Sequence, residues 1–381
     1  MNSRTSRKAC SILLPIPNLS TFGKSRYRVS QKRYVSFDLR ITCGNSRGGG
    51  NIILIGVSHD YKSIISIKNL CEAWCEFIRG KKSKKDVAEF SLNLSQNIFR
   101  LHEDLRTRDY RHGAYEAFSI SDPKPRNIHK ATVRDRLLHH AIYRVLYPCL
   151  DKKFIYDSYS CRYFKGTHRA LNRLKQFVWQ VSESNSRTCW ILKCDIQKFF
   201  ASIDQAILIE IMKRHITDFD IIWLIEKVVE SFASTGPGKG LPLGNLTSQL
   251  LANVYMNEFD QFVKHELKQP HYIRYADDFV FMHHDKGVLM EVLSEVQDFL
   301  EERLKLTLHP NKIFLKTASS GVDFLGWVHF PHHRILRTTT RRRMMKHLSG
   351  NPSKESTASY LGMLGHGNTY KIREHITKEM L

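Results

Sequence analysis

The apolar residues that follow Ser66 recur at steps of three and four, the spacing of helices with one buried face. A basic run, residues 79–85, joins two such stripes and is either a solvated turn or a contact for phosphate. The same spacing predicts a helix after Gln249, capped by the polar residues before it, and another over residues 286–304. The two stripes consist of Leu70, Trp74, Phe77 and Ile78, and of Val87, Phe90, Leu94, Ile98, Leu101 and Leu105.

Three short apolar runs, residues 189–194, 271–274 and 279–282, have a different character. They are too short for helices, and the last two are rich in aromatic and β-branched residues, so all three are predicted to be strands. Asp195 ends the first run, and the pair Asp277–Asp278 lies at the turn between the other two. The chain therefore places three carboxylates at strand ends.

Adjacent carboxylates repel each other and add nothing to a hydrophobic core. An isolated Asp-Asp pair is most often a solvated turn, but the third carboxylate changes this interpretation. Asp195 beside an Asp277–Asp278 hairpin can hold two Mg²⁺ ions, because hard divalent cations prefer oxygen ligands. The sequence thus predicts a metal site built from Asp195, Asp277 and Asp278.

In this arrangement the chain resembles the reverse transcriptases. Asp195 falls on the first catalytic Asp of their palm, and Tyr275-Ala276-Asp277-Asp278 falls on their YxDD box. The resemblance runs from about residue 61 to residue 370, with the motifs in the order of the family. The other matching segments are residues 122–126 and 133–136 in the fingers, the nucleotide-proximal loop 240–249, residues 309–312, and the primer-grip hairpin 324–327.

The resemblance implies an RNA-directed DNA polymerase that uses template RNA, a primer or cDNA end, and dNTPs. Asp195, Asp277 and Asp278 would be catalytic and would bind two Mg²⁺ ions, and Lys312 would protonate the leaving pyrophosphate. The nucleotide-binding residues would be Lys124 and Arg126 at the triphosphate, Phe200 as the steric gate against a ribose 2′-hydroxyl, and Leu243 and Gly244 beside the incoming nucleotide.

Details of the nucleotide-proximal loop resemble one branch, the reverse transcriptases of diversity-generating retroelements. Most members of the wider family carry Gln at the position of Leu243 and Pro at the position of Gln249. This branch implies copying of a template-repeat RNA into cDNA with frequent errors opposite adenine, retrohoming into a variable gene, and a small basic accessory protein. The alternatives are another bacterial reverse transcriptase (group II intron, retron or antiviral type) and a catalytically inactive RNA-binding scaffold.

The fold class implied is α+β, a right-hand polymerase of fingers, palm and thumb with an antiparallel palm sheet backed by helices. We expect a basic, disordered extension over residues 1–60 and N-terminal helices plus fingers over residues 61–185. The palm would cover residues 186–330, with strands near Trp190, over residues 272–282 and over residues 322–330. A basic helical thumb would follow over residues 331–381.

The charge of the chain fits a polyanionic partner. Lys and Arg number 59 against 37 Asp and Glu, which gives a formal net charge of +22 over 381 residues. The eight cysteines show no paired spacing of a zinc site, and we expect them to be reduced. No apolar stretch approaches the length of a membrane span, so we expect a cytoplasmic protein with no membrane contact.

Overall fold

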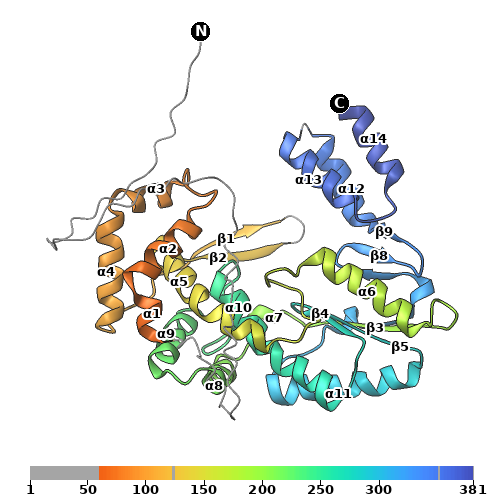
Figure 1. The fold of residues 1–381 in the computed structure, drawn as a ribbon, viewed down its shortest axis with the longest axis horizontal. Coiled ribbons are helices and arrows are strands. Elements are labelled where there is room, and N and C mark those ends of the chain that lie inside the picture. Colours follow the sequence, from red (N-terminus) through yellow and green to blue (C-terminus); the bar gives the residue numbers. More distant parts are fainter. Residues whose placement is uncertain (1–59, 122–124, 351, 381) are drawn as a thin grey trace, which may run out of the picture. The chain divides into compact units, whose positions relative to one another are not determined.

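The computed structural model describes residues 60–121, 125–350 and 352–380, and Figure 1 shows its elements. Every described residue belongs to one compact unit, Val57–Leu381. Lys124 and residues 1–59 of the expected basic extension lie outside the described residues. Within the described part of the chain, no helix combines the length and the apolar character that crossing a bilayer requires.

Helices dominate the first part of the described chain. They are α1 (Tyr61–Ile65), α2 (Ile67–Phe77), α3 (Lys85–Leu92), α4 (Leu94–Arg106) and α5 (Val133–Leu150), with a short 3₁₀ turn, η1 (Asp151–Lys153), after α5. The first apolar stripe is confirmed, because Leu70, Trp74 and Phe77 are buried on α2 where it packs against α5. The second stripe is not one helix: Asn93 ends α3 and precedes α4. The side chain of Asn93 does not cap α4, and its backbone, with φ of −118° and ψ of 36°, departs from helical geometry.

A β-hairpin that the apolar pattern did not predict lies between α4 and α5. Its strands β1 (Glu116–Ile120) and β2 (Arg126–Lys130) pair antiparallel, with Phe118 opposite Ile128. All of β1 is exposed and no residue of β2 is fully buried, so neither strand needs the apolar alternation by which a strand with one buried face is found in a sequence.

The largest sheet has four antiparallel strands in the order β4-β5-β3-β6. Three of them confirm the predicted strands: β3 (Trp190–Asp195), β4 (Tyr272–Tyr275) and β5 (Asp278–His283). The edge strand β6 (Phe314–Thr317) was not predicted. The two inner strands of the sheet are therefore β5, which begins at Asp278, and β3, which ends at Asp195.

Helices cover both faces of this sheet, which is why its central strands are buried on both sides. Helix α6 (Thr167–Val181) contacts β4 and β5, and α11 (Lys286–Leu304) contacts β3 and β5 from the other side (Figure 1). Alternate residues separate accordingly, with Ile191 and Val280 in the core that includes α6, and Leu192 and Phe279 in the core that includes α11. The predicted antiparallel sheet backed by helices is confirmed.

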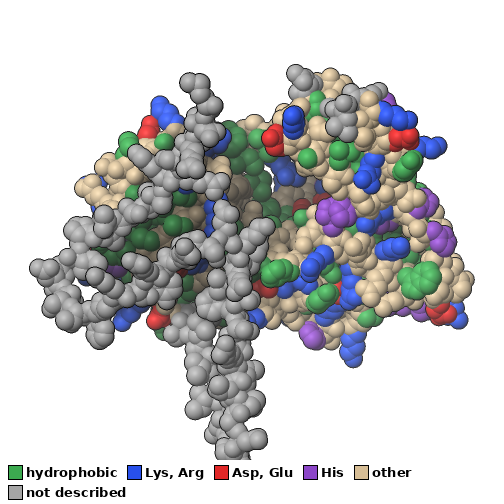
Figure 2. Space-filling view, turned by 45° about the horizontal axis from the view of Figure 1, so that its top comes forward, with side chains coloured by type: hydrophobic (Ala, Val, Ile, Leu, Met, Phe, Trp, Pro, Cys, Tyr) green, Lys and Arg blue, Asp and Glu red, His purple; other side chains and the backbone are tan. Residues whose placement is uncertain are grey.

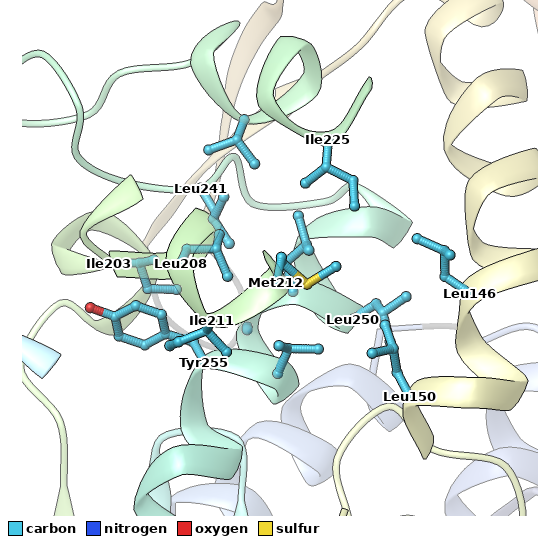
Figure 3. Packing of buried hydrophobic residues seen from close by; sticks show 14 of the residues in the cluster. Leu146, Leu150, Ile203, Leu208, Ile211, Met212, Ile225, Leu241, Leu250 and Tyr255 are labelled. Carbon is cyan, nitrogen blue, oxygen red and sulfur yellow. The ribbon is translucent and has the colours of Figure 1, made fainter. Parts of the chain in front are cut away.

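A second group of helices packs against α5 and the sheet. It comprises α7 (Phe199–Ser202), α8 (Gln205–His215), α9 (Phe219–Glu230) and α10 (Leu246–Gln261), which continues into a π-helical turn, η2 (Phe262–Glu266). Figure 3 shows Met212 of α8, Ile225 of α9 and Leu250 of α10 pointing into one core beside Leu146 of α5. This core fixes the elements on either side of the loop that joins α9 to α10.

The last part of the chain contains a separate sheet and three helices. Strands β7 (Val322–Phe324), β8 (Trp327–His329) and β9 (Arg334–Leu336) pair antiparallel in that order. The predicted strands over residues 322–330 are present, with the hairpin at residues 324–327, and they form a sheet of their own. Short 3₁₀ turns, η3 (Pro310–Lys312) and η4 (Ala318–Ser320), flank β6, and the chain ends with α12 (Thr338–Leu348), α13 (Lys354–Leu364) and α14 (Tyr370–Met380).

Candidate active site

The three predicted carboxylates meet where β3 and β5 pair. Asp195 and Asp278 are direct partners across the two strands, which places them on the same face of the sheet. Asp277 lies at the turn before β5, next to Ala276, whose φ of 57° makes the turn tight. The backbone amide of Ile196 donates to the carbonyl of Asp277 at 3.2 Å, so the turn is also bonded to the chain that leaves β3.

Burial and mutual repulsion raise the pKa of two of these carboxylates. Burial raises the pKa of Asp278 to about 7, against the opposing charge of Lys193, whose Nζ lies 3.3 Å from Asp278 Oδ2. The other oxygen, Oδ1, is buried and has no hydrogen-bond partner among the described residues. Burial, followed by the charge of Asp195, also raises the pKa of Asp277, while Lys312 and Arg126 act in the opposite direction. The site therefore favours additional positive charge.

Lys312 supplies part of that charge through a direct contact. Its Nζ donates to Asp195 Oδ1 at 2.6 Å. The chain around it is held against the end of β3, because the amide of His309 donates to the carbonyl of Asp195 at 2.8 Å and the amide of Gln197 donates to that of Thr307 at 2.9 Å. The residues before η3 thus run beside those that follow β3, and this pairing brings Lys312 to the carboxylate.

The donor set fits a hard divalent cation, because it offers carboxylate oxygens, one of them buried and unpartnered. The described residues, however, contain no group of three or more His, Cys, Asp or Glu side chains already arranged to hold a metal ion. Lys312 occupies one of the oxygens that such an ion would use. The carboxylates are thus suitable ligands, and two of them, Asp195 and Asp278, form ion pairs here with Lys312 and Lys193.

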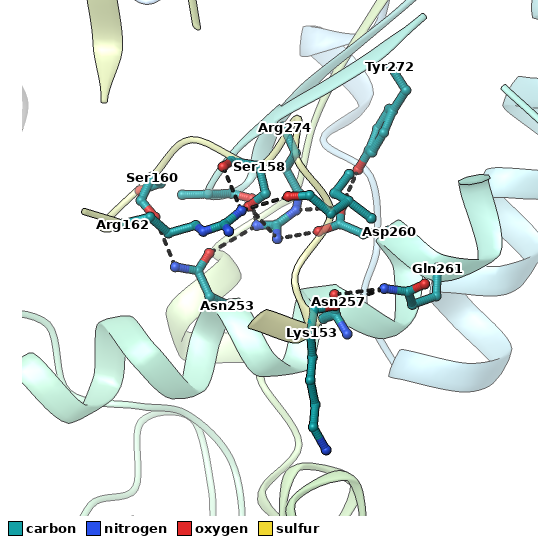
Figure 4. A network of polar contacts seen from close by, with 12 residues as sticks. Lys153, Ser158, Ser160, Arg162, Asn253, Asn257, Asp260, Gln261, Tyr272 and Arg274 are labelled. Atoms are coloured by element: carbon teal, nitrogen blue, oxygen red, sulfur yellow. Dashed lines mark hydrogen bonds and ion pairs between the residues drawn. The ribbon is translucent and has the colours of Figure 1, made fainter. Parts of the chain in front are cut away.

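A fully buried ion pair supports the turn at Asp277, and the sequence did not predict it. Arg274 and Asp260 are both 0% exposed, and the guanidinium donates to both carboxylate oxygens, at 2.7 and 2.6 Å (Figure 4). Arg274 also donates to Ser158 Oγ and, at 3.1 Å, to the carbonyl of Ala276. Tyr272 donates its hydroxyl to Asp260 Oδ1. Arg274 is the one charged residue in an otherwise apolar strand, and this feature of the sequence could have indicated a buried ion pair.

The nucleotide-proximal loop is bonded to the β1–β2 hairpin. The amide of His129 donates to the carbonyl of Leu243 at 3.1 Å, and the Asn245 side chain donates to the carbonyl of His129. Asn245 occupies the N-cap of α10 but makes no side-chain cap, so the predicted capping is wrong at this residue. Gly244 has a φ of +103°, and a Cβ there would lie 2.9 Å from Ile128 Cγ2. The close approach at Gly244 therefore serves contact with β2.

The remaining predicted residues lie on elements around the carboxylates. Phe200 is half-buried on α7, while its neighbour Phe199 is buried and meets it edge-on at 5.3 Å. Arg126 begins β2, is exposed, and acts electrostatically on Asp277. The two arginines of the second fingers segment are engaged elsewhere, with Arg134 on Asp104 and Arg136 on Asp86, each at 2.5 Å. Those two side chains link α5 to α4 and to α3, respectively.

Known proteins are similar to more than half of this chain. The family model described as reverse transcriptase (RNA-dependent DNA polymerase) matches residues 121–329, more than half of the chain. Protein YkfC of Escherichia coli is 24% identical over 273 residues, which cover 62% of this chain and 70% of YkfC. The group II intron-encoded protein LtrA of Lactococcus lactis is 23% identical over 282 residues, which cover 56% of this chain and 45% of LtrA.

Among solved structures, a telomerase from Candida albicans in complex with a fragment of telomeric RNA is similar in fold. The two chains superpose with a TM-score of 0.50 and 10% sequence identity, over 68% of this chain and 51% of the telomerase. The residues matched by the family model, 121–329, include the four-stranded sheet with Asp195, Asp277 and Asp278. The chain belongs to the reverse transcriptase family, the RNA-dependent DNA polymerases.

Proposed function

We propose that the chain is the reverse transcriptase of a diversity-generating retroelement, which copies a template-repeat RNA into adenine-mutagenised cDNA for retrohoming into a variable gene. The observation that carries the polymerase part is the pairing of Asp195 with Asp278 beside the turn at Asp277. Within this proposal, residues 61–185 form N-terminal helices and fingers, residues 186–330 the palm, and residues 331–381 the thumb.

Reverse transcriptase domains generally use divalent metal ions, and we assign two Mg²⁺ ions to Asp195, Asp277 and Asp278. Bound there, the ions would activate a primer 3′-hydroxyl and steady the triphosphate leaving group. Lys312 would give a proton to the pyrophosphate. Arg126, Lys124 and Gly244 would lie along the nucleotide, and Phe200 would exclude a ribose 2′-hydroxyl.

Primer extension on an RNA template tests the assignment of the carboxylates. Asp277→Asn and Asp195→Asn keep the shape of the side chain and remove a charge, so each should lower the rate about 10²-fold or more. Asp298→Asn, an exposed carboxylate on α11, is the matched control and should extend normally. Near-normal extension by either site variant would contradict the assignment.

The branch assignment rests on Leu243, whose backbone is bonded to β2 and whose side chain is half-buried. A Gln at this position can donate a hydrogen bond near the incoming nucleotide, which Leu cannot do, and one such bond changes discrimination by up to about tenfold. Sequencing of cDNA products should show errors concentrated opposite adenine, and Leu243→Gln should reduce them. Equal fidelity opposite adenine and guanine in the wild type would refute the branch and leave the polymerase intact.

A second candidate is a reverse transcriptase of group II intron type, which the similarity to LtrA favours. Both candidates synthesise DNA on RNA, and the adenine-error assay separates them. An inactive RNA-binding scaffold is the third, and it is excluded if the wild type extends primers.

Reverse transcriptases bind template RNA and nucleotides, and the charge of this chain suits such partners. Figure 2 shows Lys, Arg and His side chains spread over the described face that it views. The resemblance adds a small basic accessory protein to the proposal. Copurification of the full chain with the product of an adjacent small gene tests that partner.

A further inference from the structure

A cavity of about 300 Å³ lies away from the carboxylates, between elements that are far apart along the chain. Its walls come from α6, from β3 at Ile191, from residues 329–334 around the β8–β9 turn, and from residues 366–368 before α14. Ile191 precedes Asp195 by four residues, which corresponds to roughly 13 Å along a strand. The cavity is therefore separate from the candidate active site.

The lining of the cavity carries positive and neutral polar groups without acids. None of the described residues that line it is an Asp or a Glu. The basic and imidazole side chains in its wall are Lys175, His329, His332, His333, Arg334 and His366. A concave site with this composition attracts anions and offers nothing that repels them.

Arg334 is the central cation of this wall, and its hydrogen bonds involve neutral groups. Its Nη2 donates to Asn172 Oδ1 at 3.1 Å, its Nε donates to the carbonyl of His366, and its guanidinium lies over the ring of Trp327. The remaining nitrogen, Nη1, is buried without a hydrogen-bond partner in the described part of the chain. Burial without a compensating carboxylate lowers the pKa of Arg334.

His329 lies directly beside Arg334, because the two residues are partners across β8 and β9. Its ring is buried, with 6% of the residue exposed, and Nε2 has no partner among the described atoms. Burial, followed by the charge of Arg334, lowers the pKa of His329 to about 3, so the imidazole is neutral. A neutral imidazole can carry its proton on Nε2 and donate it. Two adjacent nitrogens, Arg334 Nη1 and His329 Nε2, thus lack hydrogen-bond partners among the described residues.

We propose that this cavity binds a phosphate group. The planar guanidinium of Arg334 and the imidazole of His329 would both donate to phosphate oxygens, and Lys175 would add a charge at the exposed rim. A phosphate would give the unpartnered nitrogens the acceptors that they lack. The volume admits a phosphomonoester with part of the group attached to it. The phosphate belongs either to a free small ion or to the end of a nucleic acid.

Thermal unfolding of the full chain in the presence of inorganic phosphate tests the proposal. The titration is run against chloride at constant ionic strength, so that general screening of the basic surface stays fixed. A ligand that binds only the folded protein raises the melting temperature in a saturable way. We expect this rise in the wild type and in the matched control Arg342→Gln, which removes an exposed positive charge on α12.

Two variants of the wall decide the outcome. Arg334→Gln should abolish the phosphate-dependent rise, and Lys175→Gln should weaken the apparent affinity by roughly tenfold. Lys175 is exposed, so its variant remains informative if Arg334→Gln does not fold. Equal rises in the wild type and in Lys175→Gln, or a rise that does not saturate, would overturn the proposal.

The source of the phosphate is separated by a second comparison. Two DNA oligonucleotides of one sequence, with a 5′-phosphate or a 5′-hydroxyl, are titrated against the wild type and Lys175→Gln. Tighter binding of the phosphorylated strand that disappears in Lys175→Gln assigns the cavity to a nucleic-acid end. Equal binding of both strands, together with a saturable response to inorganic phosphate, assigns it to a free ion.

Discussion

Replacement of Asp260 by Asn is the sharpest test of how the turn that carries Asp277 is supported. Asp260 accepts both bonds of the Arg274 fork and the hydroxyl of Tyr272, and it is fully buried. Asn keeps the size of the side chain but removes the charge and one acceptor. Arg274 would then be a buried cation with no carboxylate partner.

The expected cost follows from that uncompensated charge. Breaking a buried ion pair by removing one partner lowers the free energy of unfolding by about 3–5 kcal/mol. With an unfolding entropy of about 2.1 cal/mol/K per residue and roughly 320 folded residues, this corresponds to a fall in melting temperature of about 4–7 °C. The loss is a large part of a stability of typically 5–15 kcal/mol.

The assay combines unfolding with primer extension, because Arg274 also donates to the carbonyl of Ala276 beside Asp277. Asp260→Asn should lower the melting temperature, and extension should be reduced at temperatures where the variant is still folded. The matched control is Asp298→Asn, whose exposed carboxylate should change stability by less than about 0.5 kcal/mol. A melting temperature for Asp260→Asn within a degree of that of the control would refute this reasoning.

Three other measurements address the site and its surroundings. Gly244→Ala should reduce stability and raise the KM for dNTPs, since Ala at a φ of +103° costs about 1–3 kcal/mol and its Cβ meets Ile128. The control Gly362→Ala lies in open space on α13 and should be tolerated. Lys312→Gln should lower kcat about 10²-fold, as expected of a lost proton donor, and exposed Lys316→Gln is the control. Equal kcat values for the two variants would contradict the proposed role of Lys312. RNA affinity should fall with salt with a log–log slope of several units, and a flat response would contradict binding through phosphates.

Elements whose burial repeats along the chain could be predicted from the sequence. Helix α11 and strands β3, β4 and β5 appear where the apolar pattern placed them, because each buries a regular set of side chains. The β1–β2 hairpin and β6 were not predicted, since their residues are largely exposed and carry no such pattern. Separation of the last strands into their own sheet depends on which strands pair, and local sequence does not determine that.

The residues of the candidate site also divide into those that the sequence predicts and those that it does not. Asp195, Asp277 and Asp278 are recognisable because their motifs are local and the resemblance orders them. Partners of Arg274 lie 14 residues away at Asp260 and 116 residues away at Ser158, so no local pattern joins them. Long-range contacts of this kind become visible only when the strand and the helices are placed together.

The contact between Lys312 and Asp195 links two roles that the sequence suggested separately. The ammonium of Lys312 uses one of its three N–H donors on Asp195 Oδ1, 2.6 Å away. A cation bound to that oxygen, as proposed, would displace the ammonium and free this donor for a leaving group. The proposed ligand role of Asp195 and the proposed acid role of Lys312 would therefore be coupled. A variant that removes either side chain should therefore alter the metal dependence of extension as well as its rate.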